Sequence, residues 1–427
     1  MQFAKFFPSL LALCASRPAR AAQEPAAAPA VFFVGTSSGP ILSVSLDKRT
    51  GALKQLSSTT DGGPKPIWQE LSPANSSILY SSSTEAEDPS VGLLTSFAIG
   101  ADGSLKKLSA ITCLHSPMSL VLSPDGRTAF AAHYYTSAVS MFTTSPVTGE
   151  MKLVWERRYT LNGPGKVPAR QDAPHPHQAL FDPTGRFVVV PDLGADLLRI
   201  YSASGAELPS IAVPAGTGPR HGAFFPASTA HQAAKKEALS PYYYLVNELD
   251  NSLSVFDVTY TNSAIVLTPL QTVATVPAPS SSTGTGTGTG TNPLPPPTAA
   301  ELVISPDGRF IYVSNRGNDG VFPDNGSGDG DNAISAFSRD ADSGHIGLPR
   351  YIPSHVQTVR HFALDPTAAW LVVGGQDSGG VKAFPRDLRT GGVESSLGEY
   401  QPAAANSLDV PGTICITFSR RQRSKEP

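Results

Sequence analysis

The sequence predicts an all-β fold, a seven-bladed β-propeller closed by pairing of its N-terminal and C-terminal strands. Three observations support this prediction. A β-hairpin built around a turn proline occurs six times, a second pair of strands occurs seven times, and the two chain ends resemble the two strands of a missing seventh hairpin. Closing a ring in this way removes the sheet edges that a linear array would expose, and a sandwich or solenoid would not need complementary ends.

The repeated hairpin is clearest in residues 174–194. A short alternating run is followed by an Asp-Pro-Thr-Gly turn and then by a β-branched and aromatic run, which is typical of two antiparallel strands. Residues 225–246 contain a looser copy, in which a polar insert widens the turn. The other copies are centred on Pro73, Pro124, Pro306 and Pro366.

Each hairpin is followed by a second strand pair, often with a Thr-Gly or Asp-Gly turn. The first strand of this pair is expected at residues 41–46, 93–98, 138–142, 197–201, 253–258, 333–337 and 381–384. Residues 31–35 match the second strand of the hairpin, and residues 414–418 match its first strand. Together these two end segments build the seventh hairpin.

The segments outside the repeats are short. Residues 1–21 combine Lys5, an apolar run and an Ala-Arg-Ala step, which predicts a signal peptide and therefore a secreted protein. Residues 22–30 form a linker, 31–420 the propeller with surface inserts at 227–241 and 277–297, and 421–427 a polar tail. After cleavage, Cys113 and Cys415 would form either one disulfide or two unlinked buried thiols.

Composition excludes several classes of function. A net charge of −3 with scattered Lys and Arg gives no basic face for nucleic acid, and no later segment is apolar enough to span a membrane. No Gly-x-Ser-x-Gly motif is present, and neither remaining cysteine has a histidine signature nearby. His175, His177 and Asp192 resemble a metal-ligand set, but His-x-His at a strand start usually binds no metal. We therefore expect a monomer without metal or cofactor.

The repeat alignment places polar side chains at one mouth of the central channel. Residues in one alignment column point the same way from their blades. The inner strands begin with the pairs Ile67-Trp68, Met118-Ser119, His177-Gln178, Arg220-His221, Ala300-Glu301 and Arg360-His361. The second strands end near the same rim with His133-Tyr134, Asp192-Leu193, Asn247-Glu248, Asn315-Arg316 and Gln376.

This set of side chains suits an anionic, oxygen-rich small molecule. His177 and Glu248 can exchange protons, while Arg220, Arg316 and Arg360 offer guanidinium groups to a carboxylate or phosphate. The alternative is that polar groups line the channel because it holds water, and that the Arg and His side chains connect neighbouring blades.

Several phrases of the sequence resemble the seven-bladed propeller lactonases, which include propeller-type 6-phosphogluconolactonases and fungal carboxymuconate lactonizing enzymes. They are PHPHQALFDPTGRFVVVPDLG, GPRH, VNELDNSLSVF and AELVISPDGRFIYVSNRG. The resemblance implies catalytic roles for His177 (or His175), Arg220, Glu248 and Arg316. We add His175, His221, Asn247, Asn315, Arg360 and Gln376 as expected substrate-binding residues. The last blade departs from the family pattern at residues 359–362, 366–368 and 374–376, and the two inserts are also unusual.

Three functions follow as hypotheses. The first is a lactonase that hydrolyses an anionic sugar-acid lactone, with the arginines binding the acidic group and the developing oxyanion and with His177 or Glu248 activating water. The second is a lactonizing cycloisomerase of the carboxymuconate type, which uses the same charges. The third is a non-catalytic secreted propeller that binds a ligand.

Overall fold

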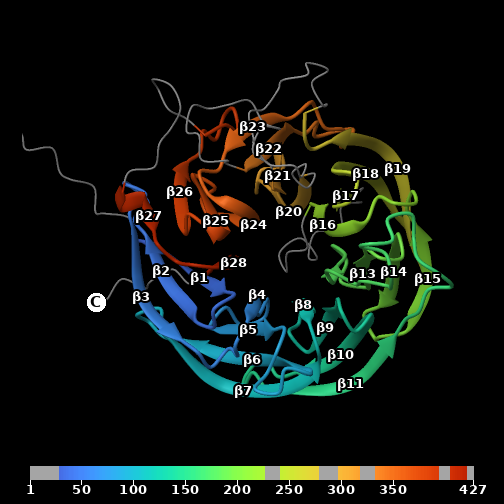
Figure 1. The fold of residues 1–427 in the computed structure, drawn as a ribbon, viewed down its shortest axis with the longest axis horizontal. Coiled ribbons are helices and arrows are strands. Elements are labelled where there is room, and N and C mark those ends of the chain that lie inside the picture. The colour runs from blue at the N-terminus through green and yellow to red at the C-terminus, as the bar shows by residue number, and fades with distance from the viewer. Residues whose placement is uncertain (1–27, 227–240, 278–296, 318–331, 394–403, 421–427) are drawn as a thin grey trace, which may run out of the picture.

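The computed structural model describes residues 28–226, 241–277, 297–317, 332–393 and 404–420. Seven antiparallel sheets of four strands each are arranged around a central axis (Figure 1). The predicted signal peptide, most of both inserts and the polar tail lie outside the described residues. No helix within these ranges is long and apolar enough to cross a membrane.

The innermost strand of each sheet borders the channel (Figure 1). In chain order these strands are β4 (Pro66–Leu71), β8 (Pro117–Leu122), β12 (Leu180–Phe181), β16 (Pro219–Phe225), β20 (Thr298–Ile304), β24 (Gln357–Leu364) and β28 (Thr413–Phe418). The second strands are β1 (Ala30–Thr36), β5 (Ile78–Ser83), β9 (Thr128–His133), β13 (Phe187–Asp192), β17 (Tyr242–Asn247), β21 (Phe310–Arg316) and β25 (Trp370–Ser378).

The third and fourth strands complete each blade toward the outside. The third strands are β2 (Ile41–Leu46), β6 (Val91–Ile99), β10 (Ala138–Thr144), β14 (Leu197–Ser202), β18 (Ser252–Tyr260), β22 (Ala333–Ser338) and β26 (Val381–Pro385). The outermost strands are β3 (Leu53–Thr59), β7 (Leu105–Leu114), β11 (Met151–Arg158), β15 (Glu207–Ala212), β19 (Ile265–Ala274), β23 (Arg350–Pro353) and β27 (Ser407–Leu408). A 3-10 turn, η1 (Ala404–Asn406), precedes β27.

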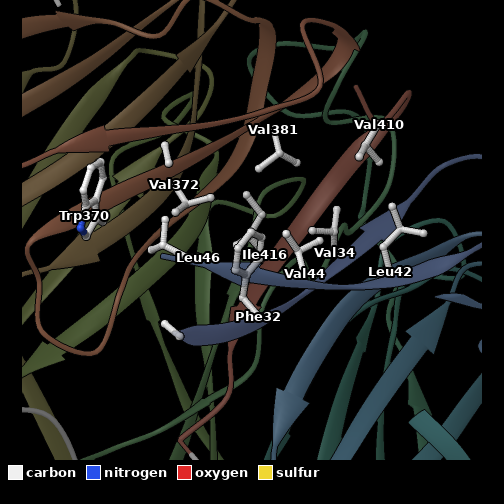
Figure 2. Close-up of a cluster of buried hydrophobic side chains, with 12 residues drawn as sticks. Phe32, Val34, Leu42, Val44, Leu46, Trp370, Val372, Val381, Val410 and Ile416 are labelled. Atoms are coloured by element: carbon white, nitrogen blue, oxygen red, sulfur yellow. The ribbon is translucent and has the colours of Figure 1, made fainter. Parts of the chain in front are cut away.

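The predicted closure of the ring is confirmed. Strand β28 pairs antiparallel with β1, from Phe32 opposite Phe418 to Thr36 opposite Thr413, in the sheet β28-β1-β2-β3. Figure 2 shows the apolar layer between this first blade and the last one, in which Phe32, Val44 and Ile416 face Val372 of β25. Complete burial of one such side chain contributes about 1.5–3 kcal/mol, so this packing helps to hold the two chain ends together.

The turns explain why the repeat is readable in the sequence. In the turn after β8, Ser123 Oγ accepts hydrogen bonds from the backbone N–H groups of Arg127 and Thr128. Gly126 in the same turn adopts a φ of +66°. The last blade has Ala368 at the corresponding glycine position, and its φ of +56° shows that the turn is preserved despite the Cβ atom. The repeat therefore survives this departure from the family pattern.

The two cysteines are free and buried, which decides between the two alternatives for them. Cys113 lies on β7 and Cys415 on β28, so they belong to different blades. Burial raises the pKa of both thiols, to about 12 for Cys415. They act as small apolar side chains rather than as a disulfide.

Candidate active site

Every inner strand contains an extra residue at the point where it enters the channel. On β16, Pro219 pairs with Asn247 and His221 with Val246, which leaves Arg220 between them without a partner on β17. Register shifts of the same kind fall at Ile67, Met118, Ala300-Glu301, Arg360 and Ile414. Near His177, Pro176 pairs with Asp192 and Leu180 pairs with Val189. The segment that contains His177 is therefore one residue longer than the facing segment of β13. A β-bulge re-aims side chains, so two successive residues of one strand can face the channel.

The bulges create two adjoining spaces. A large cavity of about 430 Å³ is lined by Met118, Tyr134, Tyr135, Ala169, Arg170, Asp172, His175, His177, Glu248, Arg316 and Arg360. A small pocket of about 10 Å³ is lined by Ile67, Trp68, Met118, His177, Arg220, His221, Glu301, Arg360, His361 and Ile414. The large cavity has the size of a small-molecule site, while the small pocket has room for about one water molecule at most. Met118, His177 and Arg360 border both spaces.

His177 has one engaged and one available ring nitrogen. Its Nδ1 lies 3.0 Å from Nε2 of His221, and its Nε2 makes no hydrogen bond within the described part of the chain. Burial, together with the charges of Arg220, His221, Arg360 and Arg316, lowers the pKa of His177 well below 6.5. A neutral imidazole with a free nitrogen at a cavity wall can accept a proton.

Glu248, in contrast, is fixed as a carboxylate. Its oxygens lie 2.6 Å from Arg170, 2.8 Å from Arg220 and 3.0 Å from Arg316. Burial alone raises the pKa of Glu248, but the charges of Arg316, Arg220 and Arg170 outweigh it and hold the pKa at about 2. A carboxylate with so low a pKa is a poor general base, although it orients three guanidinium groups.

The arginines differ in how much of their hydrogen-bonding capacity is used. Arg220 is 1% exposed and is bound by Glu248 and by the carbonyl oxygen of Ala300. Arg316 pairs with Glu248, yet its Nε is buried without a partner among the described residues. Arg360 contacts the sulfur of Met118 and has no carboxylate partner in the described segments. Arg316 and Arg360 are therefore the better placed to bind a ligand.

His175 forms part of the cavity wall and is less well placed than His177 to accept a proton. Its Nδ1 lies 3.0 Å from the carbonyl oxygen of Tyr134 and its Nε2 lies 3.1 Å from Asp172, so both ring nitrogens are engaged. Its ring also stacks on Tyr134 at 4.2 Å. Of the two histidines in the H-x-H segment, His177 is the one with a free nitrogen.

The remaining predicted substrate-binding residues lie outside the large cavity. The amide group of Asn247 donates to Ser252 and Ser254, and that of Asn315 donates to Ser335, within their own blades. Successive residues of a strand face opposite sides of the sheet, so Asn247 and Asn315 face away from the side on which Glu248 and Arg316 line the cavity. Gln376 on β25 lines neither space, and His221 lines only the small pocket.

A cavity-lining arginine was missed in the sequence. Arg170 lies in the connection between β11 and β12, reaches Glu248 and donates to the hydroxyl of Tyr134. The fully buried Gln171 anchors this connection by donating to the carbonyl of Leu193 and to the carboxylate of Asp196. The length of this connection is the sequence signal that could have revealed Arg170. A connection of about 20 residues is unusual in a compact domain and is often functional.

Within the described residues, no group of three or more His, Cys, Asp or Glu side chains is arranged to hold a metal ion. The histidines of the small pocket bond to one another and to Glu301 instead.

Comparison with known proteins identifies the family to which this propeller belongs. Residues 31–418 match the family described as "Lactonase, 7-bladed beta-propeller". The chain belongs to this lactonase family. Among its relatives, the probable 6-phosphogluconolactonase of Arthroderma benhamiae is 35% identical over 403 residues, which covers 93% of this chain and 91% of the relative.

Other similar proteins share less sequence identity with this chain. The 6-phosphogluconolactonase of Bacillus subtilis is 27% identical over 306 residues, covering 71% of this chain and 73% of the relative. A solved structure of the periplasmic gluconolactonase of Pseudomonas aeruginosa superposes with a TM-score of 0.73 at 25% identity, covering 92% of this chain and 99% of that one. The predicted family and fold are thus confirmed.

Proposed function

We propose that this lactonase family member hydrolyses an anionic sugar-acid lactone in the large cavity. The proposal rests on one observation. A neutral His177 with a free ring nitrogen lines the same cavity as an excess of guanidinium groups. Arg170, Arg316 and Arg360 line the cavity, and Arg220 lies behind them, while Glu248 and Asp172 are the only carboxylates in its described lining. Such an excess of positive charge favours an anionic ligand.

Hydrolysis of the lactone begins with activation of a water molecule. Nε2 of His177 accepts a proton from a water molecule whose oxygen forms a bond to the lactone carbonyl carbon. The resulting oxyanion is stabilised by guanidinium N–H groups of Arg316 or Arg360. The ring C–O bond then breaks, and the imidazolium returns the proton to the leaving alkoxide, which yields the open hydroxy acid. Glu248 holds the arginines and takes no proton.

The names of the relatives support the substrate class. The relatives described above are named 6-phosphogluconolactonase or gluconolactonase, so sugar-acid lactones are the candidate class; a phosphorylated lactone is anionic and suits the positive charge of the cavity, whereas unphosphorylated gluconolactone is neutral. Secretion remains a prediction from residues 1–21, and it would favour an extracellular lactone whose negative charge comes from a free carboxylate rather than from a phosphate.

A panel of lactones tests the proposal. Purified protein is incubated with a phosphorylated sugar-acid lactone, its unphosphorylated analogue, a simple neutral lactone and carboxymuconate, and acid release is measured above the spontaneous rate. We expect turnover of at least one anionic sugar lactone. Ring formation from carboxymuconate would instead indicate a cycloisomerase, and binding without turnover across the panel would indicate a ligand-binding propeller.

Arg360 is expected to bind the anionic group of the substrate. Replacing it by methionine removes a charge-assisted hydrogen bond worth about 1.5–3 kcal/mol, so KM for the anionic lactone should rise about 10-fold to 100-fold. The KM of a neutral lactone should change far less. The exposed Arg49 supplies a control, Arg49→Met, that should leave both constants unchanged. An equal rise in KM for neutral and anionic lactones would contradict this role.

The pH dependence should follow His177. A general base acts only when unprotonated, so activity is present above its pKa and is lost as the pH falls through it. Because the pKa of His177 is lowered well below 6.5, kcat/KM should stay flat as the pH falls through 6.5 and decline only in more acidic solution. Initial rates from about pH 4 to pH 8, corrected for spontaneous hydrolysis, measure this limb. An acidic limb centred at or above pH 6.5 would exclude His177 as the base.

A further inference from the structure

The small pocket contains a buried carboxylate that the proposed chemistry has not used. Glu301 is 4% exposed, and within the described residues no lysine or arginine forms an ion pair with it. Its oxygens lie 3.1 Å from Nδ1 of His221 and 3.3 Å from Nε2 of His361, and one of them accepts the backbone N–H of Leu302 at 2.9 Å. A buried carboxylate is costly unless donors surround it, so the two histidines must present N–H groups to it.

The surrounding donors fix which nitrogen of each ring carries the proton. The backbone N–H of Ile416 points at Nδ1 of His361, at 3.3 Å, so that nitrogen accepts and Nε2 donates to Glu301. Nδ1 of His221 donates to the same carboxylate, which leaves Nε2 of His221 as an acceptor. Among the described residues, the group that faces this acceptor is Nδ1 of His177, at 3.0 Å, so His177 must donate there.

These bonds form one continuous chain from Glu301 through His221 to His177. The chain crosses three neighbouring blades, because Glu301 lies on β20, His221 on β16 and His177 just before β12. With its Nδ1 proton committed to His221, His177 keeps Nε2 unprotonated, and this is the nitrogen left to the cavity. The ring of Trp68 packs against one side of these bonds. It lies edge-on to His221 and His361, with ring centroids 5.6 Å and 5.7 Å apart.

We propose that Glu301 and His221 are positioning residues, which act through hydrogen bonds to hold His177 in the tautomer that presents an unprotonated Nε2 to the substrate. The carboxylate has a second effect, since its negative charge stabilises the imidazolium that forms at His177 during water attack, through the intervening ring. This inference rests on the proposed lactonase function for its kinetic consequences, but the tautomers themselves do not depend on it.

The tautomers are tested by NMR on protein labelled with ¹⁵N at histidine, with assignment by His177→Gln and His221→Gln. In the unmodified protein we expect both His177 and His221 to carry the proton on Nδ1 and to have an unprotonated Nε2. Glu301→Gln places an amide where the carboxylate was, and the Nδ1 tautomer of His177 should no longer be uniform. A proton on Nε2 of His177 in the unmodified protein would overturn the proposal.

The kinetic test uses Glu301→Gln on a substrate that the panel has identified. Supporting groups of this kind typically contribute about 10-fold to 100-fold, so kcat should fall by that factor while KM changes by less than about twofold. If this variant does not fold, His221→Gln interrupts the same chain one residue closer to His177, and the same split is expected. The control is His133→Gln, which removes another fully buried histidine that lines neither cavity and bonds to the Leu114 carbonyl of the neighbouring blade and to Ser140 of its own.

The control should lose stability and keep its kcat. Unchanged kcat in folded Glu301→Gln, or a loss of kcat no larger than that of His133→Gln, would refute the positioning role. If the unmodified protein hydrolyses no lactone at all, the proposed function fails, and the NMR measurement still decides whether the chain sets the tautomer of His177.

Discussion

Replacing His177 by glutamine should lower kcat on an identified lactone substrate by about 10²-fold to 10⁴-fold, the usual contribution of a positioned general base. Glutamine keeps a polar side chain in the space of the imidazole but cannot accept a proton from water. Because the arginines remain in place, KM should change much less than kcat. Steady-state kinetics on the purified variant measure both constants.

The control for this substitution is the exposed His345, which lies outside both cavity linings. His345→Gln should retain full activity. A His177→Gln variant that keeps kcat within tenfold of the unmodified protein would show that another group activates water. The pKa of Glu248, about 2, makes that carboxylate a poor replacement.

Replacing Glu248 by glutamine should lower the free energy of unfolding by about 3–5 kcal/mol, because it leaves buried guanidinium groups without their shared anion. Arg220 and Glu248 are each 1% exposed, and Arg316 is 15% exposed, so solvent screens this cluster only weakly. The direction agrees with linkage. A carboxyl whose pKa falls from 4.5 to about 2 on folding stabilises the protein above pH 4.5, and that stabilisation is lost as the pH falls toward 2.

The measurement is the urea midpoint at neutral pH. Glu150→Gln provides a matched control, because Glu150 pairs with Lys152 at 3.1 Å on the surface, with both side chains more than half exposed. An exposed pair of this kind contributes at most about 1 kcal/mol, so the control should unfold near the unmodified midpoint. Equal midpoints for the two variants would show that the arginines do not need Glu248 as a counter-ion.

The contacts of Glu248 and His177 explain why substitutions at these two residues should have separable effects. Glu248 contacts arginines from three parts of the chain and therefore contributes to folding, whereas His177 meets the cavity through a nitrogen that no described residue uses. We therefore expect the two substitutions to affect activity and stability separately, although both residues line the same cavity.

Local sequence patterns were sufficient to predict the architecture. Strand alternation, turn prolines and left-handed glycines are local features, and they repeat with the blades, so the strands, their number and the closure by residues 31–35 and 414–418 could be predicted without coordinates. The four residues implied by the family resemblance, His177, Arg220, Glu248 and Arg316, do gather around two adjoining spaces.

The surroundings of each of these residues, from which their roles are proposed, could be read only from the folded chain. The bulge in every inner strand overrides simple alternation, which is why Arg220 and His221 both face the channel although they are adjacent in sequence. Asn247 and Asn315 line neither space, because their amide groups donate to serines of the adjacent strands. The contacts that separate a base from a counter-ion join segments far apart in the chain, such as His221 with Glu301. Their distances, and hence the pKa values, depend on how the blades pack.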